Sequence, residues 1–421
     1  MRWEHGSFFS IIRLSRGAFV VPTFVLLLPG MLHATVVTQI SEFSGLRAEW
    51  FNLISRSSSA TVFDTFEWQF CWWRRIGKKR PGSKLQIVLL RDDSGLLIGI
   101  LPLYTKIWAC WPMRRLYFIG SGFSDYHDVI AATGYEEGVV REFRRCLIEL
   151  IKWSIADLNQ LREGGVLRNY LQPEDLTVFN ILELAQEECP YLALPQGSKG
   201  EERWELLLAG YSKKMRGNVR YYNRALDRVY SVERIVAGTR DEVNEALTAL
   251  FILHQRRWNE RWLPGVFYSR AARDFHRAAA TDLLDRGLLR LHYLKLDNSV
   301  EAVLYCFSLK GVSSYYQGGF EPTLSRLSLG SVVTGLAIHQ AVIGDDIKFD
   351  FLRGNEPYKR RWTLGASAWN HRWVMARKNF LPFPGVVAVT RLELRVEHRL
   401  KEWMHHQGSR KSGDPAEKGD K

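Results

Sequence analysis

From residue 36 onward, short apolar runs alternate with segments in which apolar residues recur at three- and four-residue spacing. Such short runs are typical of buried strands, and the longer spacing is typical of amphipathic helices. In the first half we expect strands at 36–40, 85–90, 96–103 and 116–120. Helices are expected at 42–54, 66–76 and 136–153. The polar turn at 91–95 predicts a hairpin between the second and third of these strands.

The second half repeats this plan at a larger scale. Its expected helices are 212–228, 241–261, 271–286 and 329–343. Its expected strands are 231–236, 288–296, 300–309, 312–320, 347–352 and 369–376. Residues 159–172, in contrast, are polar and broken by two glycines. The chain is therefore predicted to be an α/β protein with mixed sheets, built as two similar halves.

Prolines and glycines near residue 200 mark the expected boundary between the halves, which are assigned to 31–200 and 201–385. Residues 1–30 hold an apolar segment that Pro22 interrupts and that is too short for a secure membrane span. We expect an extension outside the fold, with a mis-assigned start or a weak membrane anchor as its two explanations. Residues 386–421 are expected to form a charged helix and a mobile tail.

Charge and cysteine content narrow the choice of partners. A net charge of +13, spread along the chain without a long basic run, favours a phosphate-bearing ligand over nucleic acid. The five cysteines are widely spaced and form no CxxC motif, so the sequence indicates neither a zinc ribbon nor a redox dithiol, and we predict no metal. A reducing cytoplasm is the simplest location. The 46% hydrophobic content excludes disorder for most of the length.

Two polar features stand out within the apolar patterns. Asp350 lies in an expected buried strand, where a carboxylate needs a partner, and Arg353 is the nearest candidate. Four arginines recur every fourth residue at 216, 220, 224 and 228, forming one stripe on an expected helix. Such a stripe is usually a solvated face, although it could also bind an acidic polysaccharide, a lipid head group or tRNA.

Several motifs occur in an order that resembles a known family. In the second half these motifs are His254-x-x-x-Trp258, Tyr316-Gln317-Gly-Gly, Leu329-Gly330 at a helix start, and Asp350-Phe-Leu-x-Gly354-x-x-x-Tyr358-Lys359-x-x-Trp362. In the first half they are FxWxxxWW at 66–73, GILPL at 99–103 and GSGFSDY at 120–126. Over residues 36–376 this order resembles the CelD/BioF-like acetyltransferases of bacterial cellulose and exopolysaccharide loci, which are distantly related to the FemABX peptidyltransferases.

The resemblance implies a tandem double GNAT-like fold with the active site in the C-terminal half. It implies transfer of an acyl group, expected to be acetyl, from acyl-CoA to an amine or hydroxyl of an envelope or exopolysaccharide acceptor. The donor pyrophosphate would bind the helix start formed by Leu329, Gly330, Ser331 and Val332, where free N–H groups and a partial positive charge favour anions. Here the sequence departs from the GNAT signature, because Leu329 occupies the first glycine position, and the alternative is an ordinary helix capped by Ser328.

Catalytic roles follow from the same resemblance. Tyr358 would protonate the leaving thiolate, and Lys359 would hold a donor phosphate. Asp125, or else His127, would accept the acceptor proton unless this loop merely closes a turn, and His254 ranks second to Asp125. The expected substrate pocket comprises Tyr126, Tyr316, Gln317, Asp350, Gly354 and Trp362, with a packing role favoured for Trp362.

Two other functions compete with this assignment. One is a Fem-like transferase that uses aminoacyl-tRNA as donor, and the other is a non-catalytic GNAT scaffold that binds a partner through a basic face. The leading hypothesis is a cytoplasmic acyltransferase, possible at the inner face of the membrane through peripheral association, with a small-molecule, saccharide-linked or lipid-linked acceptor. Acceptor, acyl chain and oligomeric state are not encoded in any recognisable motif.

Overall fold

The computed structural model describes residues 32–107, 113–171, 177–259, 265–378, 380 and 382–411. The extension predicted at residues 1–30 and the end of the predicted tail lie outside the described residues. The strands are β1 (His33–Val37), β2 (Lys84–Arg91), β3 (Leu97–Ile107), β4 (Arg114–Phe118), β5 (Ile130–Ala131), β6 (Ile155–Arg162), β7 (Phe179–Ala193), β8 (Val232–Val236), β9 (Leu289–Leu296), β10 (Ser299–Leu309), β11 (Val312–Phe320), β12 (Lys348–Asp350) and β13 (Ser367–Arg377).

The α-helices are α1 (Ile40–Gly45), α2 (Arg47–Arg56), α3 (Phe66–Arg75), α4 (Glu136–Glu149), α5 (Val166–Tyr170), α6 (Gly200–Ala209), α7 (Lys213–Val229), α8 (Arg240–Asn259), α9 (Arg270–Asp285), α10 (Leu329–Ile343), α11 (Pro357–Thr363) and α12 (Phe383–Lys411). Short 3-10 helices are η1 (Val62–Asp64), η2 (Gly77–Lys79) and η4 (Pro322–Leu327). The predicted strands and long helices of the second half are therefore confirmed, most closely at 312–320 and 329–343.

The two halves share one topology. In the first, β1 to β4 form an antiparallel meander, and after α4 the chain returns as β6, parallel to β4. In the second, β8 to β11 form the same meander, and after α10 the chain returns as β12, parallel to β11. This repeat confirms the predicted mixed α/β fold of two similar halves.

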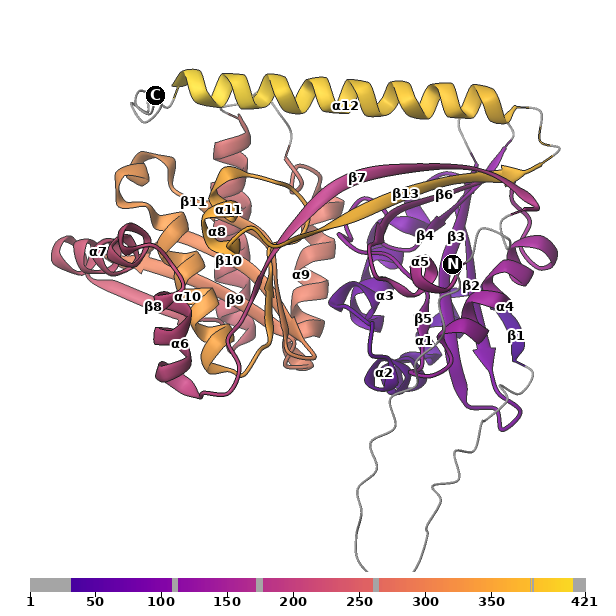
Figure 1. Cartoon of the computed structure of the whole chain (residues 1–421), viewed down its shortest axis with the longest axis horizontal. Coiled ribbons are helices and arrows are strands. Elements are labelled where there is room, and N and C mark those ends of the chain that lie inside the picture. Colours follow the sequence, from indigo (N-terminus) through magenta and orange to yellow (C-terminus); the bar gives the residue numbers. More distant parts are fainter. Residues whose placement is uncertain are drawn as a thin grey trace, which may run out of the picture.

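The final strands of the two halves are exchanged. β6 pairs with β13 from the far end of the chain, whereas β12 pairs with β7 from the first half. β7 and β13 also pair with each other over eleven residues. All strands consequently join one mixed sheet in the order β1-β2-β3-β4-β6-β13-β7-β12-β11-β10-β9-β8, with β5 beside β3. Figure 1 shows β7 and β13 as the long pair that runs between the halves.

The structure adds detail to the sequence pattern at three places. The helix expected at 42–54 is two helices that meet at Leu46. Residues 159–172, which are polar and broken by two glycines, contain the end of β6 and the short helix α5. The strand expected at 369–376 forms, but it completes the sheet of the first half. The polar residues of β6 hid this strand from sequence analysis, because their partners come from β13. Arg372 donates two hydrogen bonds of 2.8 Å to Asp157, and Asn370 donates one of 2.7 Å to Gln160.

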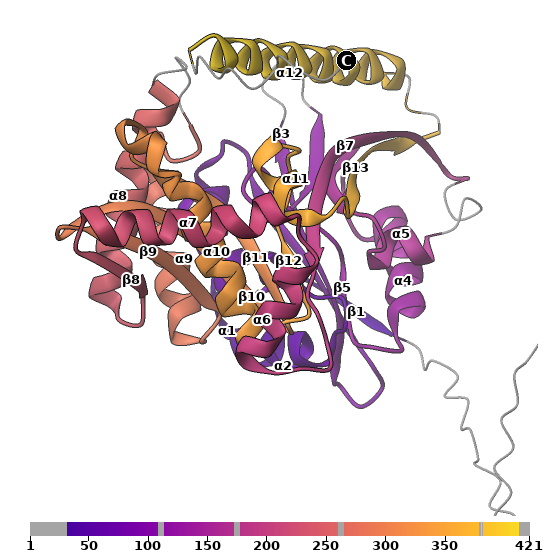
Figure 2. The same cartoon turned by 60° about the vertical axis from the view of Figure 1, so that its left-hand side comes forward.

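The two halves also share a core. An aromatic cluster joins Phe63 and Trp68 of the first half to Phe307 and Tyr316 of the second, with ring centroids 5.3 to 6.4 Å apart. A second core lies on the other face of β9 to β12, under α6, α7 and α10. Figure 2 shows these three helices together on one face of that half.

The exchange predicts that β13 stabilises the first half. Trp373 of β13 is 4% exposed in the main core, so Trp373→Ala should lower the free energy of unfolding by about 3–5 kcal/mol. Trp369→Ala on the same strand removes a side chain that is 43% exposed and should cost less than about 1 kcal/mol. Urea unfolding followed by circular dichroism measures both values. Equal costs for the two variants would contradict the packing of β13 described here.

Candidate active site

β11 and β12 diverge after three residue pairs. Val312, Ser313 and Ser314 pair with β12, and the chain beyond Asp350 then follows β7, where Phe351 N donates to Pro190 O at 3.0 Å. Within the described residues, the rest of β11 has a partner strand only on its β10 side. The backbone edge of β11 from Tyr315 to Phe320 is therefore open to an extended ligand, which can bond to it as an added strand would.

The corresponding divergence in the first half is filled. β4 and β6 pair only at Arg115 and Leu116. Beyond that point the edge of β6 is taken by the loop at 120–128, since His127 forms a parallel bridge to Leu161 and donates its N–H to Gln160 O at 2.9 Å. Loop 120–128 thus fills the divergence between β4 and β6 in the first half. Among the described residues, no segment fills the corresponding divergence between β11 and β12 in the second half.

Tyr358 of α11 stands beside the open edge. Its ring centroid lies 6.1 Å from that of Tyr315 on β11, and the two hydroxyls share a hydrogen bond. Burial raises the pKa of Tyr358 well above its usual value and that of Tyr315 to about 12, so both phenols are protonated at neutral pH. Arg257, at the end of α8, lies near both tyrosines and 5.1 Å from the centroid of the Phe320 ring. A cation therefore lies beside the tyrosine that was predicted to be the acid, whose role stays a prediction.

The start of α10 is less open than the sequence suggested. The amides of Ser331 and Val332 donate to Ser328 O at 2.8 and 3.1 Å, so two of the four predicted anion donors already have partners. A Cβ on Gly330 would lie 3.1 Å from the Phe320 ring, which shows that this glycine accommodates an aromatic neighbour. Ser328 has a φ of 52° and makes no side-chain cap, so the expected Ser328 cap is wrong.

A buried ionic network joins the halves next to this divergence. Arg353 Nε lies 2.7 Å from Asp125 Oδ1, and Lys348 Nζ lies 2.8 Å from Asp350 Oδ2. Tyr126 also donates its hydroxyl to Asp350, at 3.0 Å. The expected pair of Asp350 and Arg353 is therefore wrong: each of the two binds a different partner, because the chain turns away from β12 between them.

The Asp125 carboxylate forms an ion pair with Arg353. Its side chain is 5% exposed, burial raises its pKa, and the Arg353 guanidinium opposes that shift. His127 donates its Nδ1–H to Asn159 O at 2.9 Å, and burial lowers its pKa to about 4, so it is neutral. These contacts give loop 120–128 a structural role at the junction of the halves.

Other predicted pocket residues pack or hydrogen-bond within the chain around the point where β11 and β12 diverge. Lys359 is buried and donates to Arg353 O at 2.7 Å and to Glu356 at 2.9 Å, which argues against a free phosphate-binding lysine. Trp362 is buried against Tyr211, whose hydroxyl donates to Trp362 O at 2.6 Å, in agreement with the favoured packing role. Gly354 has a φ of 103°, where a side chain would be strained and would meet the Glu356 carboxylate.

The opposite face of β11 carries the remaining candidates. Tyr316 donates to Phe123 O of the first half at 2.8 Å. His254 of α8 is 3% exposed and packs against β11 so closely that a Cβ on Gly319 would lie 3.2 Å from its backbone nitrogen. Burial lowers the pKa of His254 to about 4, and its Nδ1 has no hydrogen-bond partner among the described residues. Gln317 is half-buried on the same strand.

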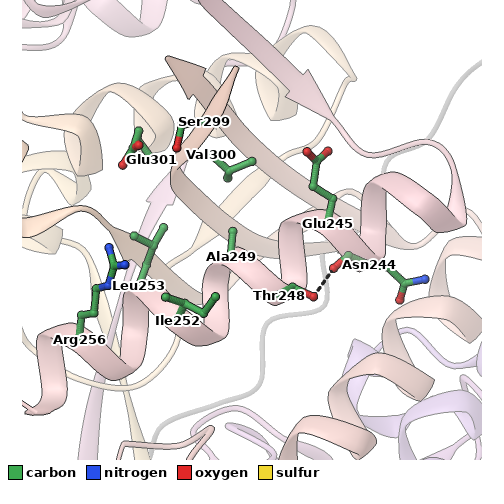
Figure 3. A pocket seen from close by; sticks show the side chains of 10 residues that line it. All are labelled: Asn244, Glu245, Thr248, Ala249, Ile252, Leu253, Arg256, Ser299, Val300 and Glu301. Atoms are coloured by element: carbon green, nitrogen blue, oxygen red, sulfur yellow. Dashed lines mark hydrogen bonds between the residues drawn. The ribbon is translucent and has the colours of Figure 1, made fainter. Parts of the chain in front are cut away.

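Two cavities lie elsewhere on the second half. One, of about 550 Å³, lies between α8 and the start of β10, where Asn244, Glu245 and Thr248 face Ser299 and Glu301 (Figure 3). The other, of about 480 Å³, lies among α6, α7 and α10. Neither cavity is lined by a predicted site residue, whereas the open backbone edge of β11 lies beside Tyr358. Among the described residues no cluster of His, Cys, Asp or Glu side chains could hold a metal ion.

Residues 213–360, from α7 to α11, match the sequence model of the acetyltransferase (GNAT) domain family. This segment contains the whole β11–α10–β12 unit described above. Residues 213–360 are therefore similar to a GNAT domain. The match is to this broad family, and the narrower CelD/BioF-like assignment stays a prediction.

Solved structures extend the likeness to both halves. FemX resembles this chain with a TM-score of 0.55 and 9% identity, covering 81% of this chain and 96% of FemX. The C-terminal domain of a putative lysylphosphatidylglycerol synthetase from Agrobacterium fabrum gives 0.47 and 10%, covering 84% and 97%. A tandem GNAT protein from the clavulanic acid biosynthesis pathway gives 0.39 and 10%, covering 81% and 98%. No curated protein matches the chain. The FemX likeness shows a FemABX-like fold.

Sequence analysis did not single out two residues that lie beside Tyr358 in the structure. Tyr315 was passed over in favour of its neighbours Tyr316 and Gln317, although strand alternation places it on the opposite face from Tyr316. Arg257 ends a long helix, and no sequence signal places the end of α8 beside β11. Within the described residues, no helix is both long and apolar enough to cross a membrane.

The ionic network gives a stability prediction. Arg353→Met should leave the Asp125 carboxylate buried without its guanidinium and lower the free energy of unfolding by about 3–5 kcal/mol. Asp125→Asn in the same chain should restore part of this loss, because the uncompensated charge is gone. Arg224→Met, at an exposed site on α7, is the matched control and should be nearly neutral. Additive effects of the two network changes in urea unfolding would show that the pair does not couple.

Proposed function

We propose that the protein is an acyltransferase that binds an acyl-CoA thioester along the open edge of β11 and transfers the acyl group to an amine or hydroxyl. The observation that carries this proposal is the difference between the halves: the same divergence is filled by loop 120–128 in the first half and open in the GNAT domain. The pantetheine arm of CoA is extended and rich in amides, which suits an unpaired strand edge.

Tyr358 is the proposed acid. As the acceptor nitrogen or oxygen attacks the carbonyl carbon, a new C–N or C–O bond forms and the C–S bond breaks. The departing thiolate takes a proton from the Tyr358 hydroxyl, and the proton released by the acceptor balances this loss. Burial keeps Tyr358 protonated at neutral pH, so its proton is available when the thiolate develops, and the strongly basic phenolate then regains a proton from the acceptor.

His254 fits the proton-accepting role better than Asp125, so the predicted ranking is reversed. The Asp125 carboxylate is engaged by Arg353 at 2.7 Å. His254 is neutral, lies against β11 and has an unpartnered Nδ1 among the described residues. In this proposal the acceptor proton reaches His254 from the α8 side of β11, where the buried imidazole ring packs against Trp258 and Phe267.

The acceptor class rests on the motif resemblance, which favours an envelope or exopolysaccharide precursor. An aminoacyl-tRNA donor remains the competing function, favoured by one observation: Arg224 and Arg228 of α7 are exposed, with no partner among the described residues. Thermal-shift titrations with acetyl-CoA, free CoA and tRNA separate the two. At about 100 times its dissociation constant, the true donor adds roughly 2.7 kcal/mol to stability.

Tyr358→Phe tests the chemistry. It removes one hydroxyl and little volume, so kcat should fall by roughly 10²-fold while the dissociation constant for acyl-CoA stays within about twofold. Release of free thiol reports kcat, and the thermal shift reports binding. Tyr315→Phe, which removes the hydrogen-bonded neighbour, is the matched control and should lower kcat less. An unchanged kcat in Tyr358→Phe would remove this residue from the mechanism.

Arg257→Ala tests donor recognition. Loss of the cation near Tyr358 should weaken CoA binding by about tenfold, and the wild-type affinity should fall with salt more steeply than that of the variant. Arg256→Ala is the control, because the neighbouring Arg256 points to Glu321 at 2.7 Å. Similar losses in both variants would indicate a general effect of charge rather than a contact made by Arg257.

A further inference from the structure

Helix α12 is attached to the body along one face only. Val386 and Thr390 are 3% and 1% exposed, and Val386 packs with Val374 of β13. Glu393 lies 3.5 Å from Arg372, which belongs to the buried pair with Asp157. The first turns of α12 are therefore fixed to the exchanged strand, and the helix continues as the outermost element on one side of the molecule, across both halves (Figures 1 and 2).

One exposed flank of α12 carries an apolar stripe. Val389, Leu392 and Val396 are 38%, 59% and 50% exposed. At about 100° per residue these three positions fall within a sector of roughly 60°, which begins about 60° from Val386. The stripe is thus a continuous surface that the body leaves uncovered.

A row of arginines borders the apolar stripe. Arg391, Arg395 and Arg399 are exposed and recur every fourth residue, so they line up along the helix beside Leu392 and Val396. Among the described side chains of α12, the one carboxylate is Glu393, which is turned toward Arg372. The exposed surface of α12 therefore combines an apolar flank with a row of arginines opposite the buried side.

This combination fits an anionic lipid surface better than a protein. A stable protein interface buries about 800 Å² on each partner, far more than three side chains provide. A helix lying in the plane of a membrane needs only a narrow apolar stripe, with arginines that extend to the phosphates on its flank. A flat surface can also reach α12 along its length, because no other element projects beyond it on that side in either view.

We propose that α12 is a membrane-surface helix, which docks the protein on anionic phospholipid through Val389, Leu392 and Val396 with Arg391, Arg395 and Arg399. This inference is independent of the acyltransferase proposal. In both views α10 begins on the side of the molecule along which α12 runs. Docking through α12 would accordingly hold the open edge of β11 near the bilayer, where a lipid-linked acceptor would be located.

Co-sedimentation of the full-length protein with vesicles tests the proposal. Phosphatidylcholine vesicles containing about a quarter phosphatidylglycerol should bind the protein, and pure phosphatidylcholine vesicles should bind it much more weakly. Each arginine near an anionic surface contributes roughly fivefold, so replacing Arg391, Arg395 and Arg399 by Gln should weaken binding on the order of 100-fold. Leu392→Gln with Val396→Gln should weaken it at least about tenfold.

Controls make the result decisive. Leu206→Gln changes an equally exposed apolar residue, 49% exposed on α6, and should leave vesicle binding unchanged. Melting temperatures within about 2 °C of wild type confirm that the surface variants fold. Equal binding of all variants to anionic vesicles would place membrane contact elsewhere in the chain and overturn the proposal. A lipid-independent dimer that Leu392→Gln with Val396→Gln abolishes, seen by sedimentation velocity, would overturn it as well.

Discussion

The exchange of β7 and β13 is the constraint on which the rest of the structure depends. Each half ends with a strand that the other half supplies, so the sheet has no internal edge at the junction. A strand that pairs on both sides satisfies its backbone groups. The junction is consequently the part of the molecule where polar side chains can be buried, because every position around them is fixed by two neighbouring strands.

The polar network follows from that constraint. Asp157, Asp125 and Asp350 are each 5% exposed or less and each has a basic or hydroxyl partner from a distant part of the sequence. Such pairs gain little net stability over apolar residues, yet breaking one is costly. In this fold the polar pairs fix the position of the chain. They determine where the chain leaves β12, and beyond that point β11 has no partner strand on this side.

The sequence predicted helices and strands well where the partners of a segment lie in the same half of the chain. Strand 312–320 and helix 329–343 carry uniform apolar runs whose partners are close in the chain, and both were located within a residue. β6 and β7 were missed because their charged residues are satisfied across the exchange, as Asp157 is by Arg372. The same limit applies to the site. Tyr358 could be named from its motif. The contacts of Asp125, Arg353 and Arg257 join segments far apart in the sequence: Asp125 lies 228 residues from Arg353, and Arg257 lies 63 residues from Phe320.

The two halves have the same topology, but the first half supports the structure around the candidate site of the second half. The loop at 120–128 closes the first divergence with backbone bonds, and its side chains then reach into the second half: Asp125 binds Arg353, Tyr126 binds Asp350, and Phe123 O accepts from Tyr316. Three contacts from one loop thus fix the chain on both sides of the open edge. The filled divergence positions the open one, so a change in loop 120–128 should alter the position of β11.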